Sequence, residues 1–220
     1  MVLEAFRERV SAYVSRLAHP FLGWQPERLS WIALGWAALA AALCALVRWT
    51  TPLLFLPAAA AIFLSGLFDV LDGEVARATG RASVRGDFLD HVLDRYADVL
   101  LLVGIAVSGY VYPLLALFAL VSLLLTSYMG TQAQAVGQGR LYRGLLSRAD
   151  RLVVLTLAAF LEFDWSLPWP WAPSAPWAHF HVAGISFTVI DVALVYFVIA
   201  GQWTAYERAR RTYRALPNPP

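Results

Sequence analysis

Six long apolar segments restrict what this chain can fold into more than any other feature of its sequence. Hydrophobic residues make up 60% of the 220 positions and charged residues only 15%, against about 45–50% and about 25% in soluble domains. About 20 apolar residues in succession can cross a bilayer as a helix. The sequence therefore predicts an all-α, polytopic membrane protein with one bundle of six transmembrane helices over residues 31–203. The predicted spans are 31–47, 52–71, 88–112, 113–136, 151–163 and 182–203.

The N-terminal segment has an amphipathic pattern. Apolar side chains recur there at helical spacing, with charged residues on the other faces; they are Val2, Phe6, Val10 and Val14. This pattern predicts an interfacial helix over residues 1–20 that lies on the membrane surface, and a soluble helical cap is the alternative. We expect a single domain over residues 1–220, with residues 204–220 as a cytoplasmic tail.

The basic residues indicate how the chain is oriented. All 17 of them are arginines. If six spans leave both termini on the same side, every arginine except Arg48 and Arg95 falls on that side or in its loops. Positively charged loops of membrane proteins stay in the cytoplasm. The sequence therefore predicts a multi-pass protein of the cell membrane whose termini and Arg-bearing loops are cytoplasmic.

Two pairs of aspartates interrupt the apolar pattern around the connection between the second and third predicted spans. Asp69 and Asp72 are three residues apart. Asp90 and Asp94 are four apart, so each pair lies on one face of a helix, and Asp98 continues the second stripe. Carboxylates near hydrocarbon are costly unless cations compensate them. Hard cations such as Mg²⁺ or Mn²⁺ bind several carboxylate oxygens at once, so these pairs predict a metal site.

Small residues and one arginine accompany these acids. Gly73, Gly86 and Ala76 remove side-chain bulk next to the carboxylates, so a phosphate or a nucleotide can approach the backbone closely. Arg77 adds a permanent positive charge that suits bidentate contact with a phosphate. Helix packing is the alternative role for a small residue in a membrane helix, and it stays open for Ala76.

Eight positions of this segment resemble, in residue type and spacing, the signature of the CDP-alcohol phosphatidyltransferase family. They are Asp69, Asp72, Gly73, Ala76, Arg77, Gly86, Asp90 and Asp94. The resemblance implies a six-helix membrane enzyme, usually a homodimer, with two divalent cations, Mg²⁺ or Mn²⁺, at the cytoplasmic membrane boundary. It also implies transfer of a phosphatidyl or archaetidyl group from a CDP-lipid donor to the hydroxyl of a small polar alcohol, with release of CMP.

The same resemblance implies roles for individual residues. The implied metal ligands are Asp69, Asp72, Asp90 and Asp94, and Asp94 is also the implied general base. The nucleotide and pyrophosphate pocket is implied to be lined by Gly73, Ala76, Arg77 and Gly86. This agrees with the chemistry, because cations neutralise a pyrophosphate while a carboxylate takes the proton from the attacking hydroxyl. Before the first span, Glu27 stands where the family often has asparagine, and Ser30 where it has threonine.

Arginines after the fourth predicted span indicate a phosphorylated acceptor. In relatives that transfer to inositol phosphate, this region supplies basic residues for the acceptor's phosphate, and Arg148 and Arg151 resemble them. We therefore expect inositol phosphate or glycerol phosphate as the acceptor. Serine or another unphosphorylated alcohol is the alternative, as is a purely structural role for these arginines.

Two other classes of protein are alternatives. A divalent-cation transporter would distribute its acids through the depth of the membrane, whereas these acids cluster at one face. A non-catalytic scaffold would carry an altered motif position, and none of the eight is altered. Asp191, in the last predicted span, is either functional or bonded to a neighbouring helix. His91, beside Asp90, is expected to pack against neighbouring residues or to support Asp90 rather than to bind metal, and no nucleic-acid partner is expected.

Overall fold

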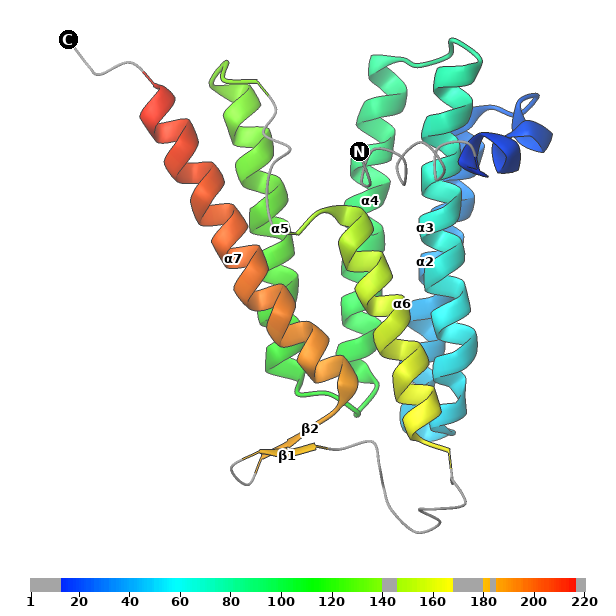
Figure 1. Cartoon of the computed structure of the whole chain (residues 1–220), viewed down its shortest axis with the longest axis vertical. Coiled ribbons are helices and arrows are strands. Elements are labelled where there is room, and N and C mark those ends of the chain that lie inside the picture. Colours follow the sequence, from blue (N-terminus) through cyan, green and yellow to red (C-terminus); the bar gives the residue numbers. More distant parts are fainter. Residues whose placement is uncertain (1–12, 140–145, 168–179, 183–184, 217–220) are drawn as a thin grey trace, which may run out of the picture.

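The computed structural model describes residues 13–139, 146–167, 180–182 and 185–216, and this part of the chain is mostly helical (Figure 1). Its helices are η1 (His19–Phe21), α2 (Pro26–Leu46), η2 (Val47–Trp49), η3 (Pro52–Leu54), α3 (Phe55–Ala78), α4 (Val84–Val107), α5 (Pro113–Ala135), α6 (Arg148–Trp165) and α7 (Val189–Ala215). A two-stranded antiparallel hairpin, β1 (Phe180–Val182) with β2 (Ile185–Phe187), precedes α7.

The six long helices form a closed ring. The main contacts join α3 to α2, α2 to α4, α4 to α5, α5 to α7, α7 to α6, and α6 back to α3. In Figure 1 the α3–α4 connection lies at the upper end of the ring and the hairpin at the lower end. Helix α6 begins well below that upper end, beside the bodies of α3 and α4. Its first residues therefore lie at the level of the α4 body and below the α3–α4 connection.

Local sequence signals fix where the helices begin. Proline occupies the first turn of α2 and of α5, where its missing N–H costs no hydrogen bond. Ser83 caps α4 with its hydroxyl. Both α6 and α7 begin with a capping box, formed by Ser147 with Asp150 and by Thr188 with Asp191. Each box satisfies backbone N–H groups that a helix start otherwise leaves unpaired.

Asp191 is a structural residue at the hairpin end of the ring. One of its carboxylate oxygens accepts a hydrogen bond from the Thr188 N–H at 3.0 Å, and the other accepts one from the Tyr112 N–H at 3.1 Å. Tyr112 is the N-cap residue of α5, so this contact joins α5 to α7. Glu162 joins α6 to α7, because its Oε2 accepts a hydrogen bond from the Val189 N–H at 2.9 Å. Of the two roles considered for Asp191, the structure supports the bond to a neighbouring helix.

The predicted helical fold is confirmed for most of the described chain, but Val182 of β1 and all of β2 lie at the start of the last predicted span. The sequence predicts that span at 182–203, but α7 runs over Val189–Ala215. The capping box at Thr188 sets the later start, and the residues before it pair as strands. Helix α7 also continues through most of the predicted tail at 204–220, of which residues 217–220 lie outside the described part of the chain.

Four helices of the described chain are long and apolar enough to cross a membrane. They are the segments Pro26–Trp49, Pro52–Ala78, Pro113–Ala135 and Val189–Ala215. The sequence predicts six spans, but α4 and α6 do not meet this criterion because charged residues such as Asp94, Asp98 and Arg151 lie within them. Large apolar side chains of these four helices, including Phe63 of α3 and Ile199 of α7, are exposed on the outer surface, as expected for helices that face lipid.

The N-terminal segment packs against the ring. Of the predicted helix at 1–20, the first twelve residues lie outside the described part of the chain, and residues 13–18 are helical. Ala18 is buried in a cluster with residues of α2 and α3. The Ser15 hydroxyl donates a hydrogen bond to Oε1 of Glu74 in α3 at 2.6 Å. The interfacial position of this segment stays a prediction.

Glycine sets the spacing of two helix pairs. A Cβ placed on Gly104 of α4 would lie 2.4 Å from the carbonyl oxygen of Ala41 in α2. A Cβ on Gly201 of α7 would lie 2.9 Å from the Cβ of Ser122 in α5. Small residues allow helix backbones to approach closely in membrane proteins. The approach of α2 to α4 therefore depends on Gly104.

Gly104→Ala should destabilise the protein in detergent, because the added methyl group overlaps the backbone of α2. Overpacking of this kind costs about 1–3 kcal/mol, and thermal unfolding followed by circular dichroism measures the loss. Gly35→Ala is the matched control, since a Cβ at Gly35 of α2 meets no atom within 4 Å. Equal Tm values for the two variants would contradict the close α2–α4 contact.

Candidate metal and nucleotide site

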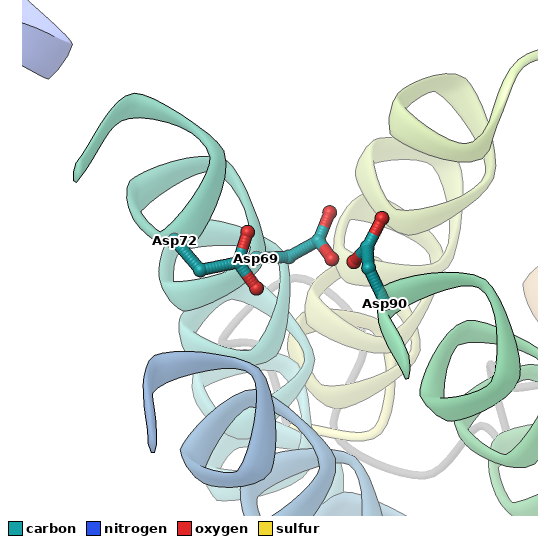
Figure 2. A group of neighbouring side chains, drawn as sticks. All are labelled: Asp69, Asp72 and Asp90. Carbon is teal, nitrogen blue, oxygen red and sulfur yellow. The ribbon is translucent and has the colours of Figure 1, made fainter. Parts of the chain in front are cut away.

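Three aspartates from two helices meet at the α3–α4 end of the ring. Asp69 and Asp72 come from α3 and Asp90 comes from α4, and one carboxylate oxygen of each lies within 4.8 Å of the oxygens of the others. Figure 2 shows the three carboxyl groups gathered between the two helices. The convergence that the sequence predicts is therefore confirmed for these three residues, which we call the carboxylate triad.

Asp72 is the most enclosed member of the triad. Only 6% of its surface is exposed, and its Oδ2 accepts a hydrogen bond from the hydroxyl of Ser30 at 2.5 Å. Ser30 lies in the first turns of α2 and is itself buried. Helix α2 thus fixes the orientation of a carboxylate that α3 supplies.

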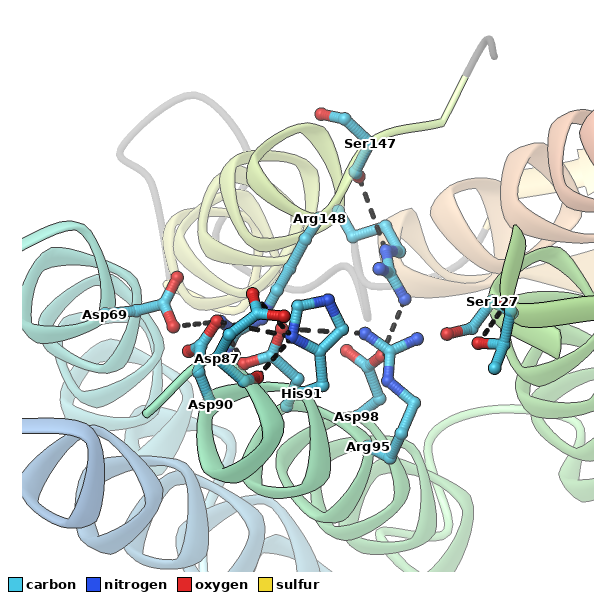
Figure 3. Close-up of polar contacts among 12 residues, drawn as sticks. Asp69, Asp87, Asp90, His91, Arg95, Asp98, Ser127, Ser147 and Arg148 are labelled. Carbon is cyan, nitrogen blue, oxygen red and sulfur yellow. Dashed lines mark hydrogen bonds and ion pairs between the residues drawn. The ribbon is translucent and has the colours of Figure 1, made fainter. Parts of the chain in front are cut away.

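Asp94 lies outside the triad and is linked to it through an arginine. One terminal nitrogen of Arg148, Nη1, forms ion pairs with Oδ1 of Asp94 and with Oδ1 of Asp69 (Figure 3). Asp94 is buried, and it lies one turn of α4 after Asp90. The sequence groups Asp94 with the other three aspartates, whereas the structure places a guanidinium between it and Asp69. Its role as a metal ligand stays a prediction.

The start of α6 explains how Arg148 reaches these acids. Ser147 and Asp150 form the capping box, with the Ser147 N–H donating to the Asp150 carboxylate at 2.9 Å. Arg148 is therefore the first helical residue of α6. Because α6 begins beside the bodies of α3 and α4 (Figure 1), its first side chain reaches acids of both helices. The Ser-x-x-Asp pattern at 147–150 is the sequence signal that identifies this helix start.

A second arginine of α6 holds a second aspartate of α4. Nη1 of Arg151 donates to Oδ2 of Asp98 at 2.6 Å, and both side chains are almost fully buried. Arg95 adds a longer contact to the same oxygen of Asp98 at 3.5 Å. The two arginines predicted to bind an acceptor, Arg148 and Arg151, are thus both engaged with aspartates. Spacing along one helix does not predict these pairs, because they join two helices.

The carboxylate triad fits a hard divalent cation. Five aspartates, the triad with Asp94 and Asp98, adjoin three guanidinium groups, so the formal charge of the cluster is negative. All three ligands of the triad offer carboxylate oxygen, which suits Mg²⁺ or Mn²⁺ better than softer metals. His91 lies at its edge, with Nδ1 2.6 Å from the carbonyl oxygen of Asp87 and 3.9 Å from Oδ2 of Asp90. The role of His91 stays a prediction.

A cavity of about 240 Å³ opens beside the triad. All four residues predicted for the nucleotide pocket line it, together with Asp72 and Asp90 of the triad; the four are Gly73, Ala76, Arg77 and Gly86. Glu27 and Ser30 of α2 line it as well. The motif residues and the start of α2 therefore line one cavity. Glu27, which stands where the family often has asparagine, is among the lining residues.

Gly73 makes room for the side chain of Arg77. A Cβ on Gly73 would lie 3.3 Å from Nη1 of Arg77, and Nη2 of Arg77 donates to Glu74 at 3.0 Å. The arginine side chain remains 66% exposed. A wider cleft of about 640 Å³ adjoins the cavity and includes Arg81 and Arg85. The mouth of the site therefore carries positive charge, whereas its floor is acidic.

Archaeal and bacterial synthases of inositol phosphate lipids resemble this chain in sequence. Over 110 residues it is 38% identical to the archaetidylinositol phosphate synthase of Methanothermobacter thermautotrophicus, which covers 49% of this chain and 56% of that protein. The match to the synthase of the same name from Pyrococcus horikoshii is 37% identical and covers 45% of this chain and 53% of that protein. The chain thus matches about half the length of these archaeal relatives. Over 222 residues it is 29% identical to the phosphatidylinositol phosphate synthase of Cutibacterium acnes, covering 97% and 99% of the two chains.

Solved structures share the fold. The phosphatidylinositol phosphate synthase of Mycobacterium tuberculosis with CDP-DAG bound aligns with a TM-score of 0.68 at 22% identity, over 91% of this chain and 93% of that one. The same enzyme in complex with manganese and citrate gives a TM-score of 0.70 at 21% identity, over 91% and 88%. At these identities the likeness establishes the fold alone.

The family model for CDP-alcohol phosphatidyltransferases matches residues 28–169, from the first turn of α2 through the end of α6. The matched region contains the carboxylate triad, Asp94 and the residues of the cavity that follow Glu27. The motif, the ring of helices and this match agree, and the chain belongs to the CDP-alcohol phosphatidyltransferase family.

Proposed function

We propose that this protein transfers a phosphatidyl or archaetidyl group from a CDP-lipid to a hydroxyl group of an inositol phosphate and releases CMP. The observation that carries this proposal is the convergence of Asp69, Asp72 and Asp90 beside a cavity lined by the remaining motif residues. The names of the sequence relatives support the inositol phosphate acceptor. The bound CDP-DAG in the mycobacterial relative supports a CDP-lipid donor.

The triad would hold the divalent cations of this reaction, which we propose to be two ions of Mg²⁺ or Mn²⁺. The manganese in the mycobacterial structure supports this metal class. When bound, such cations neutralise the negative charge of a pyrophosphate and stabilise the leaving phosphate. Ser30 would keep the Asp72 carboxylate turned toward the ions, since it already holds Oδ2 of that residue.

Other residues of the chain would bind the nucleotide and transfer the proton. The cavity beside Gly73 and Gly86 would receive the nucleotide, with Arg77 at its mouth. Asp94 would accept the proton of the acceptor hydroxyl. The hydroxyl oxygen then bonds to the lipid-side phosphorus, the bond from that phosphorus to the bridging oxygen breaks, and CMP leaves with this oxygen. A buried carboxylate suits a proton acceptor that must be shielded from water.

The acceptor would bind on the α6 side of the triad. Arg148 and Arg151 lie there with their guanidinium groups toward α4, and guanidinium is suited to bidentate recognition of phosphate. A phosphorylated acceptor, inositol phosphate or otherwise glycerol phosphate, fits these groups better than serine does. We further propose that six helices cross the cell membrane in a homodimer, with both termini and the site on the cytoplasmic side.

Purified protein supplied with a CDP-lipid and Mg²⁺ or Mn²⁺ should release CMP when inositol phosphate is added. Glycerol phosphate, serine and free inositol should give slower release, because only a phosphate complements the two arginines. Chromatographic quantification of CMP measures the reaction, and addition of EDTA should stop it. Absence of CMP with every acceptor would exclude the proposed transfer.

Asp94→Asn and Asp69→Ala should both lower CMP release, but only Asp69→Ala should also weaken donor binding. Loss of the proton acceptor in Asp94→Asn should reduce CMP release about 10²–10⁴-fold, while much of the Mn²⁺ binding, measured by electron paramagnetic resonance, remains. Asp69→Ala removes a member of the triad, so Mn²⁺ and donor binding should weaken together. Near-normal turnover by Asp94→Asn would refute the general-base assignment.

Ser30→Ala should weaken Mn²⁺ binding about tenfold, the lower end of the range for loss of a partner that orients a metal ligand. The substitution removes the hydroxyl that holds Asp72 and leaves the triad itself unchanged. Ser65→Ala is the control, because Ser65 is a buried serine of α3 whose hydroxyl has no partner among the described residues. If both variants bind Mn²⁺ equally well, Ser30 does not orient the site.

A further inference from the structure

Arg148 shares a carboxylate with the candidate metal site. Its Nη1 forms ion pairs with Asp69 and Asp94, and Asp69 is also a member of the triad. In Figure 3 its side chain extends from the start of α6 toward the acids of α3 and α4. One carboxyl group thus has two competing partners, a guanidinium of the chain itself and a divalent cation.

The other arginine of α6 does not share a carboxylate with the triad. Arg151 is paired with Asp98, which lies outside the triad, and its Nε also donates to the carbonyl oxygen of Ser147 at 3.3 Å. Nε of Arg148, by contrast, is buried without a hydrogen-bond partner among the described residues. Arg148 is therefore held chiefly through its two ion pairs, and Arg151 is held by its own helix as well.

Electrostatics opposes simultaneous occupation of Asp69 by the guanidinium and a divalent cation. A divalent cation on the triad would stand next to a guanidinium that touches one of its ligands, and like charges at such distances repel strongly in a partly buried site. The backbone of the first turn of α6 is fixed by the capping box. Release of Arg148 from Asp69 would therefore take place by rotation of its side chain.

We propose that Arg148 is an exchangeable counter-ion of the metal site: it occupies Asp69 and Asp94 in the cation-free protein and leaves Asp69 when a divalent cation binds the triad. The released guanidinium then binds the phosphate of the acceptor, a step that rests on the proposed function. Cation and acceptor binding are consequently coupled, and each strengthens the other to the same degree. Arg148 thereby sets the order in which the cation and the acceptor bind.

Arg148→Gln should bind Mn²⁺ at least about tenfold more tightly than the unchanged protein, the scale on which one nearby charge shifts an ionisation equilibrium. Electron paramagnetic resonance of free Mn²⁺ measures this on the full chain in detergent, without lipid substrate. Arg151→Gln is the matched control, since it removes the same charge from the same helix but not from Asp69, and its effect should be smaller. Unchanged or weaker Mn²⁺ binding by Arg148→Gln would overturn the proposal.

A second measurement uses the unchanged protein, because Arg148→Gln leaves Asp69 and Asp94 without their shared partner and is at risk of misfolding. Arginine-selective dicarbonyl labelling, read by mass spectrometry, should increase at Arg148 when Mn²⁺ is added and stay constant at Arg151. Labelling of Arg148 that falls or does not change would contradict its release.

The coupling to the acceptor is tested by calorimetry with inositol phosphate, with and without Mg²⁺. The unchanged protein should bind it more tightly with Mg²⁺, and Arg148→Gln should lose most of this gain. A gain that survives the substitution would show that Arg148 does not carry the coupling. Failure of CMP release in the unchanged protein would count against the proposed function and not against the exchange, because Mn²⁺ binding and labelling need neither donor nor acceptor.

Discussion

The confinement of several carboxylates at one end of a helical ring is the constraint on which the rest of this structure depends. Asp72, Asp94 and Asp98 are almost fully buried, and an unpaired charge in such surroundings costs several kcal/mol. Each therefore requires a partner from another helix, and these partners are Ser30, Arg148 and Arg151. The acids thus determine how α2 and α6 pack against α3 and α4. The guanidinium groups of the chain do not neutralise all three carboxylates of the triad, which therefore keeps a net negative charge.

The helical ring meets this requirement through where its helices start and how closely they pack. Gly104 allows α4 to approach α2 closely. Helices α3 and α4 both pack against α2, and this brings their carboxylates close to each other. The capping box at Ser147 starts α6 beside the bodies of these helices, not at the end of the ring. At the opposite end, Asp191 and Glu162 join α5, α6 and α7 through backbone N–H groups. Carboxylates at that end therefore hold the scaffold together, whereas those at the α3–α4 end leave a site open.

Helical spacing predicts correctly that Asp69 and Asp72 share one face of α3. The convergence of Asp90 from α4 with these two, and the lining of the cavity, were predicted from the resemblance to the family motif. Sequence reasoning failed for contacts between helices that the motif does not contain, and where a competing local pattern decides. The bridge from Arg148 to Asp69 and Asp94 depends on the depth at which α6 begins, which no spacing within one segment reveals. Hydropathy placed the last span too early, because the apolar residues before Thr188 suit a strand as well as a helix.

The position of the site at the helix ends reconciles two opposed requirements of the proposed reaction. A CDP-lipid has tails that need the apolar outer surface of the ring, where side chains such as Phe63 and Ile199 are exposed, whereas its nucleotide and a phosphorylated acceptor need water. A site deeper in the ring would require charged substrates to enter hydrocarbon, and one outside it would leave the carboxylates too far apart to act together. The ends of α3 and α4, together with the Arg148 side chain that reaches them from α6, place charged groups close to both environments. Because the acids there outnumber the arginines, the site favours cations when empty and can accept a phosphate group only after its own charge has been compensated.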